Sequence, residues 1–245
     1  MQRISQVVGW TLIWSGLFIF GYVGWQLYGT DVVNAGVQAE ATEDVEALLA
    51  AAKADAPVPT LIDPAEVVEP EFPPAPAPGS PTTTEPIQHF QQPNPEPGTA
   101  FAFLRIQKIG VDEAIFEGVD VPTLKMGPGH MPGTPLPGQP GNAVLSGHRT
   151  TYGRPFFDLD LLDVGDTLEV ESEIGVHVYE VREILVVTPY DFWVTYDRSG
   201  GWLTLTTCNP KFSARERLIV WAEMVSGPNH EFVQLHKAAI DEQGT

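Results

Sequence analysis

Cysteine is nearly absent from this chain, and basic residues are few. Cys208 is the single cysteine in 245 residues, so an intramolecular disulfide is excluded and the thiol is free for chemistry or packing. Lys and Arg number 13 against 32 Asp and Glu, which gives a net charge of −19. Nucleic-acid binding depends on neutralising phosphates with Lys and Arg, so this charge balance argues against nucleic acid as a partner.

Long hydrophobic runs are also scarce, because only one occurs and it lies near the N-terminus. Residues 7–28 read VVGWTLIWSGLFIFGYVGWQLY and contain no charge. As a helix this run extends ~33 Å, enough to cross a hydrocarbon core of about 30 Å. Arg3 precedes it and Asp31 follows it, so the positive-inside tendency predicts a cytoplasmic N-terminus with the remainder outside. We therefore expect residues 1–30 to form a cytoplasmic stub and a single-pass anchor in the cell membrane.

A cleaved signal peptide is the alternative for this segment, since Val37-Gln38-Ala39 resembles a small-residue cleavage site. The hydrophobic region of a signal peptide is typically about 7 to 15 residues long and follows positive charge. The run here is longer and has only Arg3 before it, which favours an uncleaved anchor.

Residues 31–99 are acidic and, toward their end, rich in proline. The stretch EFPPAPAPGSPTTTEP favours extended, solvated backbone, so we expect disorder there. A short helix is plausible around residues 43–54, which include VEALLAAAKA. The sequence thus predicts an extracellular linker, and its Pro-rich part is long enough to hold a domain up to roughly 100 Å from the bilayer.

Residues 100–226 read as a series of short strands separated by Gly and Pro. Two strands flank Gly110, residues 125–141 are so rich in Pro and Gly that a loop is expected, and residues 156–162 suggest one helical turn. A long strand is expected after Gly175. Many short strands in a small domain predict a closed or nearly closed β-barrel, followed by a polar tail over residues 227–245.

The chemical setting of Cys208 is unusual for a packing residue. It ends the β-branched strand LTLTTC just before an Asn-Pro turn, and Lys211, Arg215 and Arg217 follow closely. Nearby cations favour the thiolate, which is the nucleophilic form. A small buried side chain is the alternative role for a lone cysteine.

His148 is the second candidate. A short apolar strand over residues 143–145 leads into Ser146, Gly147 and His148, so the histidine emerges where a strand meets a loop. Functional side chains are frequent at such junctions. A lone histidine is more often a surface or satisfied core residue, so the argument depends on its combination with Cys208.

These motifs together resemble the sortase family. The matching residues are TLTTC ending at Cys208, RLIV beginning at Arg217, and LSGH ending at His148. The longer stretch GPGHMPGTPLPGQPGNAVLSGHRTTYGRPF, residues 127–156, is similar to the actinobacterial class E branch. The resemblance covers roughly residues 100–225 and implies an all-β fold, a closed eight-stranded sortase-type barrel, behind the anchor and linker.

The resemblance also implies roles for individual residues. Cys208 matches the nucleophile, His148 the catalytic histidine and Arg217 the catalytic arginine. Arg215 stays open as an alternative, because two residues apart on a strand project to the same face. Thr207 and His130 are expected to contribute to substrate binding by shaping the groove.

The loop 189–201 would border the groove in a sortase, and its aromatic residues either bind an apolar peptide segment or cover the barrel. Some sortases bind calcium near this loop. Asp191 and Asp197 are too few and too far apart to indicate a site, so we expect no metal and no cofactor.

The expected activity is cleavage of a Leu-Ala/Pro-X-Thr-Gly signal between Thr and Gly, and transfer to an amine. The expected partners are secreted proteins with C-terminal sorting signals and the amine of a peptidoglycan precursor. Three alternatives stay open: a pilus-polymerising sortase, a non-catalytic tethered binding module, and an L,D-transpeptidase. The last places Gly before its cysteine and Arg after it, whereas Thr207 and Asn209 flank Cys208 here.

Overall fold

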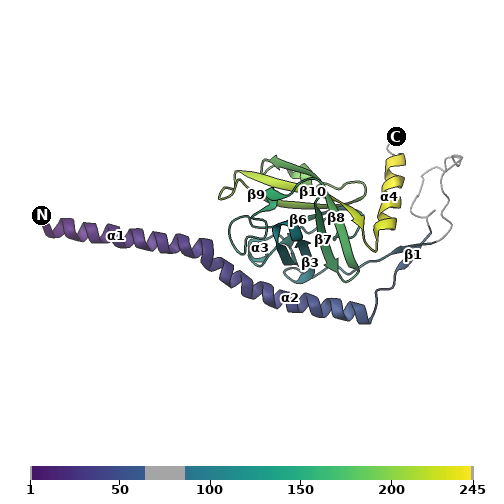
Figure 1. The fold of residues 1–245 in the computed structure, drawn as a ribbon, viewed down its shortest axis with the longest axis horizontal. Coiled ribbons are helices and arrows are strands. Elements are labelled where there is room, and N and C mark those ends of the chain that lie inside the picture. Colours follow the sequence, from purple (N-terminus) through teal and green to yellow (C-terminus); the bar gives the residue numbers. More distant parts are fainter. Residues whose placement is uncertain (1, 64–85, 244–245) are drawn as a thin grey trace.

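Eight strands close into a barrel in the computed structural model, which describes residues 2–63 and 86–243 (Figure 1). Their order around the barrel is β10-β8-β7-β3-β4-β5-β6-β9, and β9 pairs with β10 to close it. The strands are β3 Ala100–Ile106, β4 Val111–Glu117, β5 Gly129–His130, β6 Gly141–Ser146, β7 Thr167–Ser172, β8 Gly175–Val187, β9 Gly201–Asn209 and β10 Glu216–Ser226. The predicted closed eight-stranded β-barrel is confirmed.

Alternation along each strand divides the barrel into an interior and an outer face. On β9, Leu203 and Leu205 are fully buried in the main hydrophobic core, whereas Thr204 and Thr206 project to the opposite side. The core is built from such residues on every strand except the two-residue β5, together with Phe156 and Leu159 from the connection after β6. The site described below lies at one end of this barrel.

Two pairings bring distant parts of the sequence together. β6 runs parallel to β9, with Gly141 opposite Gly201 and Ser146 opposite Thr206. β9 runs antiparallel to β10 along nearly its whole length. The C-terminal ends of β6 and β9 and the beginning of β10 therefore meet at the same end of the barrel.

The N-terminal part of the chain is helical from Gln2 to Ala54. α1 spans Gln2–Gly24, a π-helical turn covers Trp25–Gly29, and α2 spans Thr30–Ala54. Within α1, Gln6–Gly24 is long and apolar enough to cross a membrane, and its side chains are not buried in the protein. Figure 1 shows α1 extending away from the barrel and α2 running along it.

α2 corrects the prediction that the anchor is followed by a linker with a helix only near residues 43–54. The helix begins at Thr30 and buries Ala41, Val45 and Leu49 against Phe103 and Phe116 of the barrel. These three helical positions are four residues apart and so share one face. Packing of that face stabilises a helix whose sequence alone indicates only its second half.

The Pro-rich segment does not separate the anchor from the barrel. β1, Thr60–Ile62, pairs with β2, Ile87–His89, in a two-stranded sheet, so the chain leaves and returns at neighbouring strands. The disorder expected between them falls on residues 64–85, which lie outside the described residues. The anticipated reach of roughly 100 Å is therefore wrong, because α2, which follows α1 after one π-helical turn, already packs on the barrel.

Two further expectations need correction. The polar tail predicted over residues 227–245 contains α4, His230–Gln243, whose Phe232, Val233 and Ala239 are buried. The Phe232 ring stacks on His89 of β2 with centroids 3.9 Å apart. The loop expected over residues 125–141 contains β5, which pairs with both β4 and β6 and so completes the barrel.

The connections are short. α3, Val121–Leu124, begins after Asp120, whose carboxylate accepts a hydrogen bond from the Thr123 backbone N–H at 3.1 Å. Three 3-10 turns occur among the described residues, at Gln107–Ile109, Leu159–Leu161 and Phe192–Thr195. The turn at Leu159–Leu161 falls within the helical turn expected over residues 156–162.

Candidate active site

Cys208 and Arg217 are directly opposite each other on β9 and β10. Opposed residues of an antiparallel pair project to the same face of the sheet, so the thiol and the guanidinium share one surface. Arg217 Nη1 donates to the carbonyl oxygens of Ala214 and Glu216, each at 3.0 Å. Arg215 precedes β10, and its side chain is 76% exposed and contacts Glu216. Register therefore places Arg217, and not Arg215, across from the cysteine.

His148 reaches the same end of the barrel through β6. The last paired positions of β6 and β9 are Ser146 and Thr206, and the Gly147 N–H donates to the Thr206 carbonyl at 3.1 Å. His148 and Cys208 each come two residues after those positions. The imidazole ring lies against the Tyr152 ring, with centroids 5.1 Å apart.

The environment of His148 favours its neutral form. Burial lowers the pKa of His148, and the positive charge of Lys125 lowers it further. Lys125 follows α3, and its Nζ lies 5.3 Å from the centroid of the Tyr152 ring. An imidazole that gives up its proton readily suits a group that must donate to a departing amine.

Sequence reasoning missed Arg149. This guanidinium is only 2% exposed, and it donates from Nη1 to the Cys208 carbonyl at 3.2 Å and from Nε to the Phe157 carbonyl at 2.9 Å. Its Nη2 pairs with Asp160 at 2.9 Å. Arg149 thus ties the backbone after His148 to the backbone of Cys208. In the sequence, the sign that Arg149 belongs to the site is its position directly after LSGH. The pattern of apolar residues around Arg149 does not distinguish it from a solvent-exposed arginine.

Thr207 is buried and acts within the barrel wall. Its hydroxyl donates to the Gly147 carbonyl at 2.7 Å, and the residue is 3% exposed. The side chain predicted to shape a substrate groove therefore links the end of β9 to the residue before His148. Its contact sets the spacing of the two strands that carry the cysteine and the histidine.

His130 lies in β5, opposite Leu145 of β6. Its Nδ1 is 2.6 Å from Glu117 Oε2, and its Nε2 is 3.0 Å from the Pro135 carbonyl oxygen. The ring is 2% exposed and borders a polar hollow of about 630 Å³ that Asn142 and Asp197 also line. The structure thus places His130 in a buried ion-pair-like contact with Glu117, on the strand next to β6.

Carboxylates of the loop between β8 and β9 are engaged in local hydrogen bonds. Asp191 accepts from the backbone N–H and the hydroxyl of Thr188, both at 2.7 Å, and Asp197 accepts from the Asn142 N–H at 3.2 Å. Among residues 2–63 and 86–243, no group of three or more His, Cys, Asp and Glu side chains is arranged to hold a metal ion.

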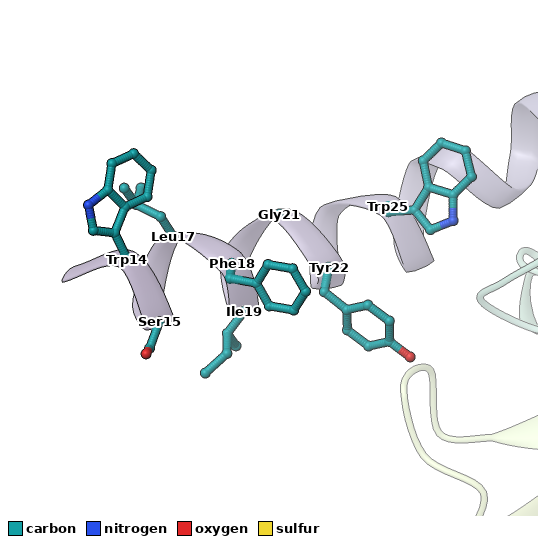
Figure 2. A pocket seen from close by; sticks show the side chains of 8 residues that line it. All are labelled: Trp14, Ser15, Leu17, Phe18, Ile19, Gly21, Tyr22 and Trp25. Carbon is teal, nitrogen blue, oxygen red and sulfur yellow. The ribbon is translucent and has the colours of Figure 1, made fainter. Parts of the chain in front are cut away.

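A hollow on α1 is unrelated to this chemistry. Figure 2 shows it: a space of about 850 Å³ bounded by side chains of the α1 region alone, from Trp14 to Trp25. One helix cannot enclose a ligand, so this is a gap between neighbouring side chains on the apolar surface of α1.

Comparison with known proteins identifies the fold family. Residues 104–225 match the sequence profile of the sortase domain. Sortase D of Bacillus subtilis is 31% identical over 228 residues, which cover 91% of this chain and 100% of that protein. The chain belongs to the sortase family.

Class E relatives are also similar to this sortase. Sortase SrtE1 of Streptomyces coelicolor is 37% identical over 146 residues, which cover 53% of this chain and 42% of that protein. The crystal structure of Sortase E1 from the same organism, with a tripeptide in the active site, gives a TM-score of 0.50 at 34% identity. That superposition covers 55% of this chain and 94% of the other. The class E resemblance is confirmed. The aligned part of this chain covers less than half the length of SrtE1.

Proposed function

We propose that this sortase is a cysteine transpeptidase in which Cys208 is the nucleophile, His148 transfers the proton, and Arg217 stabilises the oxyanion. The observation that carries the proposal is the register of β9 and β10, which puts Cys208 and Arg217 on one face. The ends of β6 and β9 add His148 to the same end of the barrel. A thiol, an imidazole and a guanidinium are the groups that acyl transfer through a thioester requires.

The first half-reaction breaks an amide and forms a thioester. The Cys208 thiolate attacks the carbonyl carbon of the scissile Thr-Gly bond, and the Arg217 guanidinium stabilises the oxyanion of the tetrahedral intermediate. Collapse of this intermediate expels the glycine amine, which takes a proton from the His148 imidazolium. The products are a Cys208 thioester and a free amine.

The second half-reaction reverses these roles. An acceptor amine attacks the thioester carbonyl, neutral His148 accepts the proton of the attacking nitrogen, and the Cys208 thiolate leaves. One amide bond has then replaced another with no net redox change and no cofactor. The substrates we propose are secreted proteins with a Leu-Ala/Pro-X-Thr-Gly signal, joined to the amine of a peptidoglycan precursor.

Ligation by the full chain in detergent micelles tests the proposal. We expect peptides carrying Leu-Ala-X-Thr-Gly or Leu-Pro-X-Thr-Gly to be joined to an added amine, as detected by mass spectrometry. Cys208→Ala and His148→Ala should each abolish the product, and Arg217→Ala should reduce it by at least about 100-fold, while circular dichroism shows an intact fold. A folded wild type that neither cleaves nor forms a thioester would instead support a non-catalytic, tethered binding module.

The proposed location is the cell membrane, with α1 as the anchor and the barrel outside. Support comes from the exposed apolar surface of Gln6–Gly24 and from the order of Arg3, α1 and Asp31 along the chain. The single cysteine is a convenient reporter of this topology. A membrane-impermeant maleimide should label Cys208 in intact cells, and labelling that needs permeabilised cells would reverse the orientation.

A further inference from the structure

The loop that carries His148 has an unusual backbone. After His148 and Arg149 the chain turns through three consecutive residues with positive φ: Tyr152 at 53°, Gly153 at 76° and Arg154 at 54°. Glycine adopts this region freely, but each of the other two residues is held in a disfavoured conformation at a cost of about 1 kcal/mol or more. Residues 148–154, which we call the histidine loop, therefore need external contacts to keep this shape.

Those contacts come from the first turn of α2. Thr30 Oγ1 accepts a hydrogen bond from the Tyr152 N–H at 3.3 Å, and Asp31 Oδ1 accepts from the Gly153 N–H at 3.1 Å. Asp31 Oδ2 also pairs with Arg154 Nη2 at 3.0 Å. Each of the three positive-φ residues is thus held by one of two adjacent residues at the start of α2.

Asn34, one turn further along α2, holds the segment on the other side of the loop. Its Nδ2 donates to the carbonyl oxygens of Lys125 and Met126, at 3.0 and 2.9 Å. Its Oδ1 lies where a Cβ on Gly153 would be, so α2 and the loop approach too closely for a larger residue there. Asn34 is 4% exposed, and α2 therefore fixes the backbone at both Lys125 and Gly153.

Both segments held by α2 touch the imidazole or its surroundings. Tyr152 contributes the ring that packs on His148, and Lys125 contributes the nearby charge that also lies over the Tyr152 ring. Cys208 and Arg217 reach the same barrel end from β9 and β10. The influence of α2 is thus directed at the histidine side of the site.

We propose that Thr30, Asp31 and Asn34 are positioning residues that hold His148 in place. The first turn of α2 then contributes to the function of the active site. The proposal rests on the catalytic role of His148 given above. It goes beyond that role because it assigns a function to a segment that precedes the barrel and lies outside the matched sortase domain, residues 104–225. α2 begins only a π-helical turn after Gly24. With α1 as the proposed membrane anchor, the same contacts hold the active-site end of the barrel next to the bilayer.

The decisive variant is Thr30→Val combined with Asn34→Ala in the full chain, because it removes all three hydrogen bonds that these residues make to Tyr152, Lys125 and Met126 without changing any charge. It also removes the bond from the Thr30 hydroxyl to the Gln26 carbonyl within the helix. We expect kcat for peptide cleavage to fall by between about 10- and 100-fold with KM little changed, the scale of a small misplacement of a catalytic group. The pKa of His148, followed by NMR titration, should rise toward its ordinary value as the loop opens and Lys125 moves away. Thr30→Ser, which keeps the acceptor oxygen, should behave as wild type.

Glu40→Gln is the matched control, because Glu40 lies on the exposed side of α2 and should change neither kcat nor the His148 titration. If the double variant folds poorly, exchanging the charges of the Asp31–Arg154 pair tests the proposal instead. Asp31→Arg alone should lose activity, and Asp31→Arg combined with Arg154→Asp should recover part of it. The proposal is overturned if the double variant keeps wild-type kcat, if its melting temperature falls with no change in the His148 titration, or if the swap recovers nothing. An inactive wild type would defeat the proposed function, and the NMR titration would still report whether α2 controls His148.

Discussion

Arg217 lies directly across the β9–β10 ladder from Cys208, whereas Arg215 lies outside the strand with its side chain in solvent. The sequence could not separate these two arginines, because residues two apart on a strand share a face. The structure separates them by where β10 begins, at Glu216. Only Arg217 is held by the ladder, and its guanidinium is braced by two backbone carbonyls.

Arg217→Ala should therefore lower kcat/KM for peptide cleavage by about 100- to 1,000-fold, the usual loss when one oxyanion donor is removed. Arg215→Ala should stay within about threefold of wild type, because an exposed ion pair contributes little. Initial rates with a quenched peptide measure both. Equal losses in the two variants would mean that the loop before β10 rearranges when substrate binds.

Arg149 makes a prediction about stability. Its guanidinium satisfies two backbone carbonyls and Asp160 in a buried position, so Arg149→Met should destabilise the fold by about 3 to 5 kcal/mol, the cost of breaking a buried charge network. Arg149→Lys should recover only part, since an ammonium cannot reproduce the planar fork. Urea unfolding measures the change, with Arg215→Ala as a surface control. A loss below about 1 kcal/mol in Arg149→Met would show that the network is dispensable.

The sequence indicates more of the barrel than of the site. Leu203 and Leu205 alternate with threonines, and this pattern indicates a strand that faces a core on one side. Cys208, His148 and Arg217 were assigned through motif resemblance, and the strand register then showed why the three motifs meet. Arg149 was not predictable, because its burial depends on carbonyls from two distant segments that only the closed barrel brings together.

The sequence of α2 contains a sign of burial. Ala41, Val45 and Leu49 recur every four residues and form one apolar stripe, but the acidic residues between them resemble a solvated linker. The docking of Asn34 and Asp31 depends on backbone groups of the barrel, which no local pattern of α2 reveals. The sequence does not indicate α4 for a similar reason, since Phe232, Val233 and Ala239 are its buried apolar residues in an otherwise polar segment.

The charge of Lys125 gives a prediction about protonation. Lys125→Met removes a positive charge that lowers the pKa of His148, so that pKa should rise, although burial still keeps it depressed. The imidazolium would then persist to higher pH in the free enzyme. NMR titration of the full chain in micelles measures the shift, and Lys53→Met, on a remote part of α2, serves as the control. A downward shift would indicate that the dominant effect of Lys125 is to keep water near the ring.

His177 predicts how stability depends on pH. This β8 histidine is fully buried, neither ring nitrogen has a hydrogen-bond partner among the described residues, and burial lowers its pKa to about 4. The unfolded chain binds a proton below about pH 6.5 and the folded chain does not, so stability is lost as pH falls from about 6.5 to 4.

From pH 7 to pH 4.5 this histidine should cost about 2 to 3 kcal/mol of unfolding free energy. His177→Leu should remove that contribution and therefore flatten the pH dependence relative to wild type. His230→Gln, a change at a partly exposed histidine, should leave the wild-type slope. Urea titrations at the two pH values provide the comparison, and identical slopes for His177→Leu and wild type would contradict the assignment.

The docking of α2 depends on a small cluster that is separate from the barrel core. Val45 is fully buried between Ala41 and Leu49 and packs toward Phe103 and Phe116, whereas Ala47, two residues away, faces solvent. Val45→Asp would bury an unpaired carboxylate, which the helix avoids by leaving the barrel. The barrel keeps its own core, so it should stay folded.

Hydrogen exchange distinguishes these two regions in one measurement. In Val45→Asp we expect the amides of α2 to exchange at least about tenfold faster while those of β6 and β9 keep their protection, because local opening need not unfold the barrel. Ala47→Asp carries the same new charge on the opposite face and should exchange as wild type. If both variants loosen α2 equally, the helix is held by its electrostatic environment and not by the buried face. If β6 and β9 also lose protection in Val45→Asp alone, α2 is part of the same cooperative unit as the barrel, and its removal would then destroy the site as well as displace His148.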